Sequence, residues 1–134
     1  MDYVKINGKV YDVIITELEE YFNILYTENT GRTIGEGAPM VLDPIGVFYG
    51  HRAIFKRRSG SEAQYDELYD LLSTPRREGI PVELAHNQTT ISYEAYVSNG
   101  GRRVRKIDRN EGKVYWDAFS VNFIPMRAQV LPDD

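Results

Sequence analysis

One amphipathic helix interrupts a chain that otherwise has the composition of β-strands. Residues 47–57 form an extended run, residues 61–73 carry a helical pattern, and residues 82–97 return to strand composition. A lone helix in the middle of a β-protein has no partner helix with which to build a layer. We therefore expect this helix to lie across an open end or an open face of the sheets.

Start and stop signals bound the helix. Ser61 and Gln64 have the spacing of a capping box, in which the Ser61 hydroxyl accepts an amide proton of the first turn while the Gln64 side chain reaches back. Pro75 ends the helix, because the residue before a proline is pushed out of the helical region. The apolar side chains that recur with helical spacing are Tyr65, Leu68, Tyr69 and Leu72. This pattern predicts a helix with one buried face.

The segment before residue 41 contains one clear signal and one ambiguous stretch. Asn7-Gly8 is the strongest two-residue hairpin signal, and it predicts an N-terminal hairpin made of residues 3–6 and 10–15. Residues 18–26 fit either a helical turn or a strand, and we interpret residues 21–26 as a strand. Residues 27–39 are rich in turn formers and predict a long loop, which in a compact domain is usually functional or mobile.

Turns divide the chain beyond the helix into four further strands, at residues 80–85, 89–97, 102–108 and 114–123. Short strands joined by tight turns are typical of sandwiches and barrels. The chain has 134 residues, no repeat and no linker, so one domain spanning residues 1–134 is expected. We predict a mainly β (α+β) sandwich or barrel of about seven to nine mostly antiparallel strands, with the single helix packed on it.

No residue pattern indicates an active site. The chain has no Cys, which excludes a thiol nucleophile, a disulfide framework and Cys-ligated zinc. His51 and His86 are the only histidines, and neither has the spacing to a carboxylate that metal sites use. We therefore expect a non-enzymatic protein with no cofactor and no metal. The N-terminus does not read as a secretory signal and no apolar run suits a membrane span, so no contact with a membrane is expected.

A basic cluster stands out in a chain whose formal net charge is −4. Its members are Arg102, Arg103, Arg105, Lys106 and Arg109. On a regular strand, Arg103 and Arg105 would share one face while Arg102 and Lys106 share the other. The cluster is open to three interpretations: a solvated hairpin, a nucleic-acid surface, or a patch that meets an acidic surface on another copy.

The composition of the rest of the chain helps to choose between these interpretations. Overall acidity and the lack of aromatic residues within the run disfavour specific nucleic-acid recognition. The N-terminal part of the chain is acidic, through Asp2, Asp12, Glu17, Glu19, Glu20 and Glu28. Opposite patches on one surface favour head-to-tail association between copies.

The order of these features is similar to the tail-tube fold of long-tailed bacteriophages, which tube proteins share with the N-terminal domain of the distal tail protein. Six segments look like small proteins encoded in prophage tail modules of Gram-positive bacteria: INGKVYDV (6–13), ENTGRT (28–33), LDPIG (42–46), YDELY (65–69, followed by Pro75), QTTISYEAYV (88–97) and VNFIPM (121–126). The resemblance implies a virion structural protein that assembles into rings, commonly hexameric. Its subunits would pair sheet edges around a lumen, with the helix outside the inner barrel.

We therefore expect a structural component of a phage or prophage tail: a tube, distal tail or tail-assembly protein made in the host cytoplasm and located in the virion. Its partners would be copies of itself and other tail proteins. The alternatives are a small adaptor or tail completion module that binds a preformed ring and, third, a wall-degrading hydrolase of the same module. The expected contacts between subunits are Thr30, Gly31, Arg32, Thr33, Arg102, Arg103, Arg105, Tyr21 and Tyr26, with Tyr49 and Tyr96 as further candidates.

Overall fold

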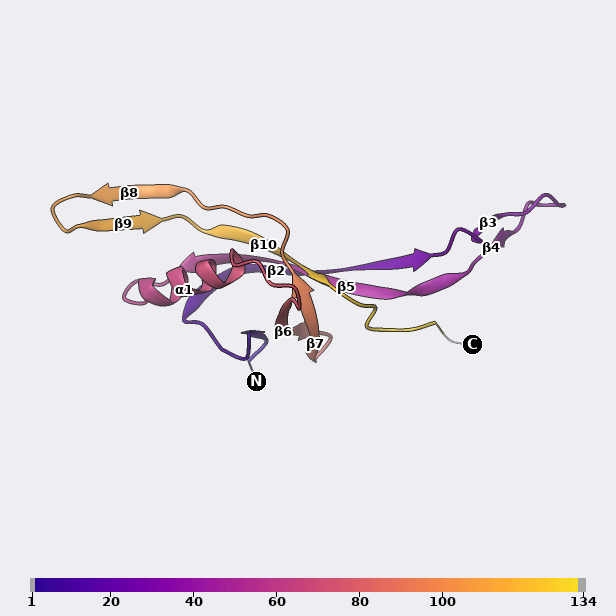
Figure 1. Cartoon of the computed structure of the whole chain (residues 1–134), viewed down its shortest axis with the longest axis horizontal. Coiled ribbons are helices and arrows are strands. Elements are labelled where there is room, and N and C mark those ends of the chain that lie inside the picture. Colours follow the sequence, from indigo (N-terminus) through magenta and orange to yellow (C-terminus); the bar gives the residue numbers. More distant parts are fainter. Residues whose placement is uncertain (1, 133–134) are drawn as a thin grey trace.

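A computed structural model describes residues 2–132 and confirms a mainly β fold with one helix (Figure 1). In chain order the elements are β1 (Val4–Ile6), β2 (Val13–Tyr26), β3 (Gly31–Arg32), β4 (Met40–Val41), β5 (Pro44–Arg57), α1 (Glu62–Leu72), β6 (Ile80–His86), β7 (Thr89–Tyr96), β8 (Val104–Asp108), β9 (Lys113–Trp116) and β10 (Phe119–Pro125). Every strand pair is antiparallel. The ten strands are one more than the upper end of the expected range: β3 and β4 were not expected, and the single strand expected at residues 114–123 is divided into β9 and β10.

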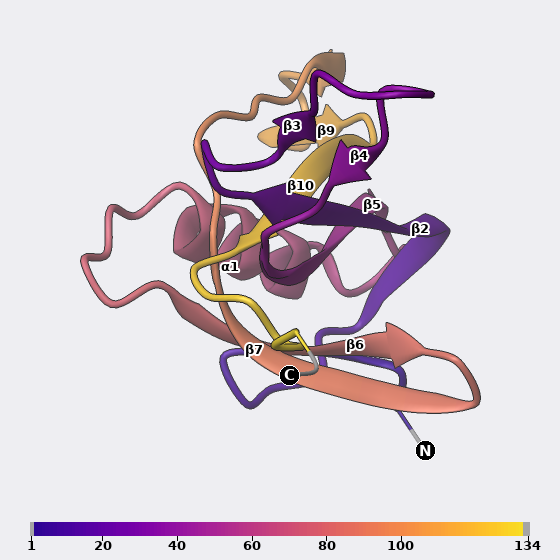
Figure 2. The same ribbon diagram turned by 90° about the vertical axis from the view of Figure 1, so that its right-hand side faces the viewer.

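A six-stranded sheet with the order β1-β6-β7-β10-β5-β2 forms the centre of the fold. β10 joins the two halves of this sheet by changing partner: residues 119–123 pair with β5, whereas Ile124 and Pro125 pair with β7. A strand that changes partner in this way makes a corner. As a result β6 and β7 run across the direction of β5 and β10, and the sheet is curled (Figure 2). Its two edges are β1 and β2.

Helix α1 covers the inner face of this curl, as expected for a lone helix. Tyr65, Leu68 and Leu72 are buried, which confirms the apolar face predicted from their spacing. The Tyr65 ring meets Phe119 edge-on with 5.3 Å between ring centroids, and the Tyr65 hydroxyl donates a hydrogen bond of 2.6 Å to the Asp117 carbonyl. Helix and sheet therefore share one core.

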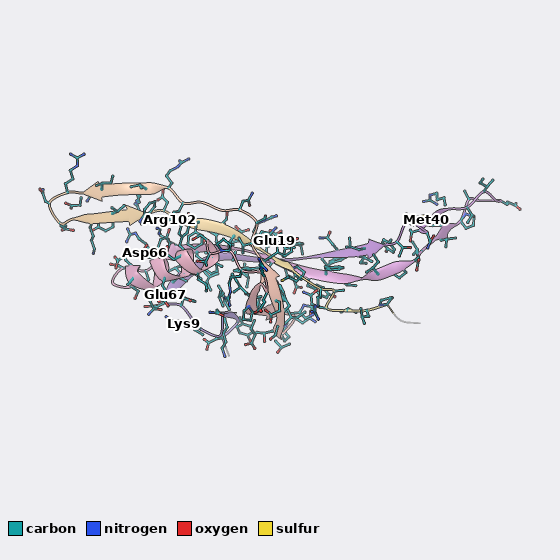
Figure 3. All side chains as sticks on the ribbon, viewed as in Figure 1. Lys9, Glu19, Met40, Asp66, Glu67 and Arg102 are labelled. Carbon is teal, nitrogen blue, oxygen red and sulfur yellow. The ribbon has the colours of Figure 1, made fainter. Side chains whose placement is uncertain are left out.

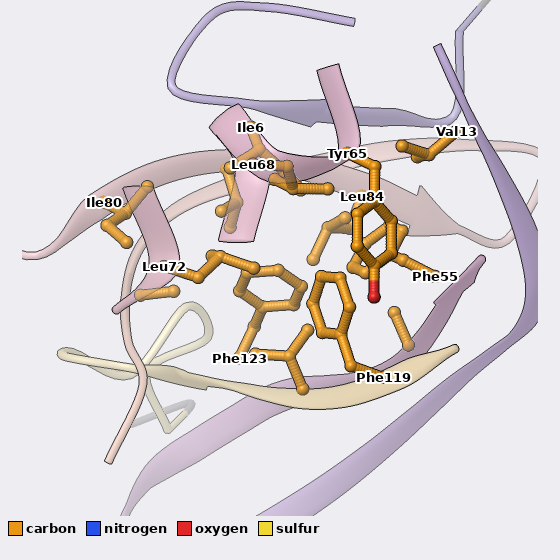
Figure 4. Close-up of a cluster of buried hydrophobic side chains, with 14 residues drawn as sticks. Ile6, Val13, Phe55, Tyr65, Leu68, Leu72, Ile80, Leu84, Phe119 and Phe123 are labelled. Atoms are coloured by element: carbon orange, nitrogen blue, oxygen red, sulfur yellow. The ribbon is translucent and has the colours of Figure 1, made fainter. Parts of the chain in front are cut away.

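That core gathers buried apolar side chains from both halves of the sheet and from α1 (Figure 4). Its members are Ile6, Val13, Ala53, Phe55, Tyr65, Leu68, Leu72, Ile80, Val82, Leu84, Ala95, Phe119, Val121 and Phe123. Burying one large apolar side chain stabilises a fold by about 1.5 to 3 kcal/mol. The cluster therefore stabilises the packing of the two half-sheets and the helix against one another.

The capping box expected at the start of α1 does not form. Ser61 is the N-cap residue, but its hydroxyl donates a hydrogen bond to the Asp12 carboxylate. The side-chain oxygen of Gln64 accepts the amide proton of Asp12 at 2.9 Å. A charged carboxylate is a stronger partner for a hydroxyl than a backbone amide is. Both side chains thus fasten the helix to the segment that leads into β2.

The predicted N-terminal hairpin is wrong beyond its turn. Asn7 and Gly8 have φ angles of 53° and 75°, and Ile6 and Lys9 exchange backbone hydrogen bonds across them. β1 then pairs with β6, whereas the chain from Val13 onward pairs with β5. The register of β2 with β5 extends from Val13 to Tyr26, and so long a ladder outweighs a hairpin that would use three residues of β1.

The strand and loop predicted for residues 21–39 also need correction. Residues 21–26 are the end of a strand of 14 residues, β2, which forms a long ribbon with β5. The segment after it is folded, because Gly31 pairs with Val41 and Arg32 with Met40, so that β3 and β4 continue the ribbon to its end. The ribbon projects from the body on one side, and the β8–β9 hairpin projects on the opposite side (Figure 1).

Candidate functional site

Two ribbons extend beyond the curled sheet, and we name them by their residues. The long arm is residues 22–49, the part of the β2–β5 ribbon that lies outside the register with β10 and carries β3 and β4 at its tip. The short arm is residues 103–116, which holds the β8–β9 hairpin. Neither arm contributes a residue to the buried core. Both are therefore surfaces available to a partner.

The long arm exposes large apolar side chains along its whole length. They are Phe22, Ile24, Leu25, Tyr26, Ile34, Met40, Val41, Leu42 and Ile45. Phe22 is 64% exposed and Leu42 59%. An isolated two-stranded ribbon is marginally stable in water, and clustered exposed apolar residues on a soluble protein mark an interaction site. The long arm is therefore a candidate interaction surface.

Both faces of the long arm are apolar. Phe22 and Ile24 lie on one face, because side chains two positions apart in a strand point the same way. Leu25 lies on the opposite face and is 47% exposed. A strand that rests on one partner alone normally has a polar outer face. The arrangement suits an arm that is covered from two sides.

The root of the long arm is held firmly to the body. The Tyr21 ring lies across Gly50, where any side chain would collide with it, and the Tyr21 hydroxyl donates a hydrogen bond of 2.6 Å to Asn122. The C-terminal segment also runs along β5, since Gln129 makes hydrogen bonds with the backbone N–H and C=O of Tyr49 at 3.0 and 2.8 Å. Tyr21, which we expected at a subunit contact, is therefore engaged within its own chain.

A polar cluster lies beneath this root, at the end of the β6–β7 hairpin. His51 is fully buried, and its ring nitrogens contact the Tyr93 hydroxyl at 2.8 Å and the Ala85 carbonyl at 2.9 Å. The Glu20 carboxylate lies 3.3 Å from His51 Nε2 and 2.7 Å from His86 Nδ1. Desolvation lowers the pKa of His51, opposed by its contacts with Ala85 and Glu20, and desolvation raises the pKa of Tyr93. The cluster ties the arm root to the β6–β7 hairpin.

Within the residues that the structure describes, no group of three or more His, Asp or Glu side chains is arranged to hold a metal ion. Both nitrogens of His51 already have protein partners. No helix within residues 2–132 is long and apolar enough to cross a membrane.

Arg102, which we expected at a subunit contact, makes several contacts within its own chain. Its guanidinium lies 2.9 Å from Asp66 and stacks over Tyr69 and Trp116, at 4.0 and 3.9 Å from the ring centroids (Figure 3). Cation–π contacts and a partly shielded ion pair hold the start of the short arm against α1. Arg102 is therefore a packing residue of this arm.

The other basic residues of the short arm are exposed, but their predicted alternation is wrong. A β-bulge lies between Val104 and Lys106, because Val104 pairs with Trp116 and Lys106 with Tyr115. Arg105 is the additional residue of this bulge, so the simple two-face assignment fails there. Arg103 and Arg105 remain exposed to solvent.

Four of the other expected contacts lie at the tip of the long arm, whereas Tyr96 is an exposed residue at the end of β7 in the body. Gly31 and Arg32 form β3, with Thr30 and Thr33 on either side. The Thr30 hydroxyl accepts a hydrogen bond of 2.7 Å from the Asp43 amide, and Arg32 donates one to the Ala38 carbonyl at 3.4 Å. These residues shape the tip, and Arg32 and Thr33 are exposed.

Sequence reasoning missed the apolar residues that flank this tip, namely Phe22, Ile24, Leu25, Met40, Val41, Leu42 and Ile45. The signal that could have found them is the run of apolar residues at positions 21–26. Asn23 is the one polar side chain among residues 22–25, so neither face of that strand is polar throughout. Tyr26, which we did expect, belongs to the same surface and is 40% exposed.

Charge separates the two arms. The long arm holds three acidic residues and one basic residue. The short arm holds five basic residues and two acidic ones. Opposite potentials at opposite sides of one molecule favour association between copies.

Comparisons with known proteins add no identification: a scan against protein-family models gave no match, and a search of curated proteins gave none at a significant level.

Proposed function

We propose that this chain is a non-enzymatic structural subunit that assembles with copies of itself through its long arm. The observation that carries the proposal is the solvated apolar surface of the long arm on both of its faces. A binding surface of this size on an arm firmly fixed to its body suits an assembly protein. It does not suit a site for a small ligand, which would need a concave pocket.

The context that we propose is the tail of a long-tailed phage or prophage, as a tube, distal tail or tail-assembly protein. A mainly β fold with one helix across a curled sheet is compatible with the tail-tube resemblance of the sequence. In this setting the subunit forms rings, which are commonly hexameric in that family, and also contacts other tail proteins. Its location would be the virion.

A shortened arm tests the assembly role. Residues 27–43 are replaced by Asn-Gly, which closes the ribbon after Tyr26 with a two-residue turn. The replaced segment supplies no residue to the core, so we expect nearly the same thermal midpoint for the monomer. Native mass spectrometry over a concentration series should show oligomers of the natural chain and only monomer for the variant.

Two results would contradict this proposal. One is a natural chain that stays monomeric from micromolar to millimolar concentration and forms no rings in electron micrographs. If the natural chain stays monomeric but binds a purified tail ring, it would instead be an adaptor or completion module. The other is a shortened variant that assembles as well as the natural chain.

A further inference from the structure

We propose that the long arm of one copy docks on the short arm of the next copy, head to tail. This inference rests on the proposed function, because it names the surface that receives the long arm. The two arms leave the body in opposite directions (Figure 1). Two copies placed in the same orientation, one beyond the other, can therefore overlap the long arm of one with the short arm of the other.

Apolar surface on the short arm matches that on the long arm. Val104, Ile107 and Val114 are 39%, 61% and 43% exposed. Ile107 and Val114 are direct cross-strand neighbours, so they form one exposed apolar pair. The short arm is itself a two-stranded ribbon whose far end lies beyond the packing of Arg102 on α1. Docking of the long arm would cover both sets of apolar side chains together.

Unused charges on the two arms have opposite signs. Within residues 2–132, Arg103, Arg105 and Lys106 take part in no ion pair, and neither do Glu28 and Glu36 on the long arm. The ion pairs within the subunit use other charges, for example Lys9 with Glu67 near α1, and Lys113 of the short arm with Glu62. The unpaired groups on the arms are thus free to face a second copy.

The two arms are different surfaces, and this determines the kind of assembly. A contact between unlike patches is heterologous, so every copy keeps one free arm after it binds a neighbour. Such a contact closes into a ring where the rotation between copies allows, and otherwise continues as a filament. A symmetric pair, in which long arm meets long arm, would bring like charges together and is disfavoured.

Charge reversal with mixing tests this docking directly. Variant A carries Glu28→Lys and Glu36→Lys, so both of its arms are basic. Variant B carries Arg103→Glu and Arg105→Glu, which makes its short arm acidic like its long arm. All four residues are exposed, so both variants are expected to fold, as judged by circular dichroism and thermal midpoint.

Each variant alone should associate on the order of tenfold to hundredfold more weakly than the natural chain, because like charges then face each other. An equal mixture of A and B should recover assembly, with the two variants alternating around the oligomer. Raising the salt from about 0.05 to 0.5 M should weaken the assembly of the natural chain. Native mass spectrometry distinguishes the variants by mass and so detects the alternation.

Matched controls change the same number of charges away from both arms. Glu78→Lys with Glu94→Lys, and Arg77→Glu with Arg127→Glu, use exposed side chains outside the two arms. These controls should assemble like the natural chain.

The possible outcomes separate this inference from the proposed function. A natural chain that never assembles overturns both. Assembly that survives in A and in B alone, or that mixing does not restore, overturns the docking of the arms and leaves self-assembly in place. Binding of duplex DNA at about 0.15 M salt that is lost in B would assign the basic residues to nucleic acid and would also overturn the docking.

Discussion

The strand β5 passes through two environments, and comparing them separates folding from assembly. In the body, Ala53 and Phe55 are fully buried beneath α1, and their neighbours on β10 complete the core. In the long arm, the same strand stays paired with β2 as far as Pro44, yet Ile45, the extra residue of a β-bulge opposite Leu25 and Tyr26, is 47% exposed. Strand formation therefore continues where the core has ended. The ladder alone extends the arm, while its side chains remain for a partner.

The largest difference between body and arm should appear when a core side chain is truncated. Leu68→Ala removes a fully buried side chain from α1 and should lower the free energy of unfolding by about 2 to 5 kcal/mol through lost burial and a cavity. Chemical denaturation measures the change. A loss under about 0.5 kcal/mol would show that α1 is a surface appendage and that body and arm do not differ as described.

The boundary between body and arm can be tested at Gly50. Gly50→Ala would push a methyl group into the Tyr21 ring and should cost about 1 to 3 kcal/mol of stability. Adding Tyr21→Ala should relieve the clash, so the double variant should be more stable than the sum of the single changes predicts. If the free-energy changes of the two single variants simply add in the double variant, the Tyr21 ring and Gly50 do not constrain each other.

Acid should weaken the arm root in the folded protein. Burial lowers the pKa of His51 below its ordinary value of 6.5, so below pH 6.5 the unfolded chain takes up a proton that the folded chain resists. The unfolded state then binds more protons, and stability falls as the pH drops from 6.5 toward the folded pKa. Each unit by which that pKa is lowered corresponds to about 1.4 kcal/mol.

Denaturation at pH 7.5 and pH 5.5 measures this effect, with His51→Gln as the control. The Gln side chain keeps hydrogen-bonding capacity but does not titrate, so the variant should depend less on pH. The prediction is wrong if both proteins lose the same stability between the two pH values.

The smallest effect on stability is expected in the arm. Phe22→Ser replaces a side chain that is 64% exposed, so the free energy of unfolding of the monomer should change by no more than about 0.5 kcal/mol. Self-association should nevertheless weaken, because the apolar surface of the arm is reduced. A large loss of monomer stability would place Phe22 in the body's core, and unchanged association would remove it from the interface.

The features that were predictable from the sequence are those fixed by local pattern. The helix is one: the spacing of Tyr65, Leu68 and Leu72 indicates a buried face whatever it packs against. The turn at Asn7-Gly8 is another, because few residues other than these tolerate positive φ there. The pairing of the strand that follows this turn is not fixed by local pattern. β2 pairs with β5, with which it forms a longer ladder than it could form with β1.

The features that escaped prediction depend on tertiary partners. Arg102 looks like its basic neighbours in the sequence, and only the position of Tyr69 and Trp116 makes it a packing residue. His51 has no recognisable motif, because its partners Tyr93 and Ala85 come from other strands. The long arm escaped notice because apolar residues on both faces hide the alternation by which strands are recognised.

The continuity of β2 and β5 from core to tip has a mechanical consequence. A pull on the tip of the long arm acts on β2 and β5 in the same direction, so the load reaches the body as shear on the hydrogen-bonded ladder between β5 and β10. The corner at β10 is different: it meets β7 through a short ladder at Ile124 and Pro125, followed by a hydrogen bond from the Met126 amide to the Glu94 carbonyl. A force across this corner would open these contacts one after another. In the proposed assembly, tension between subunits would therefore travel along β5 into the core and bypass the weaker seam.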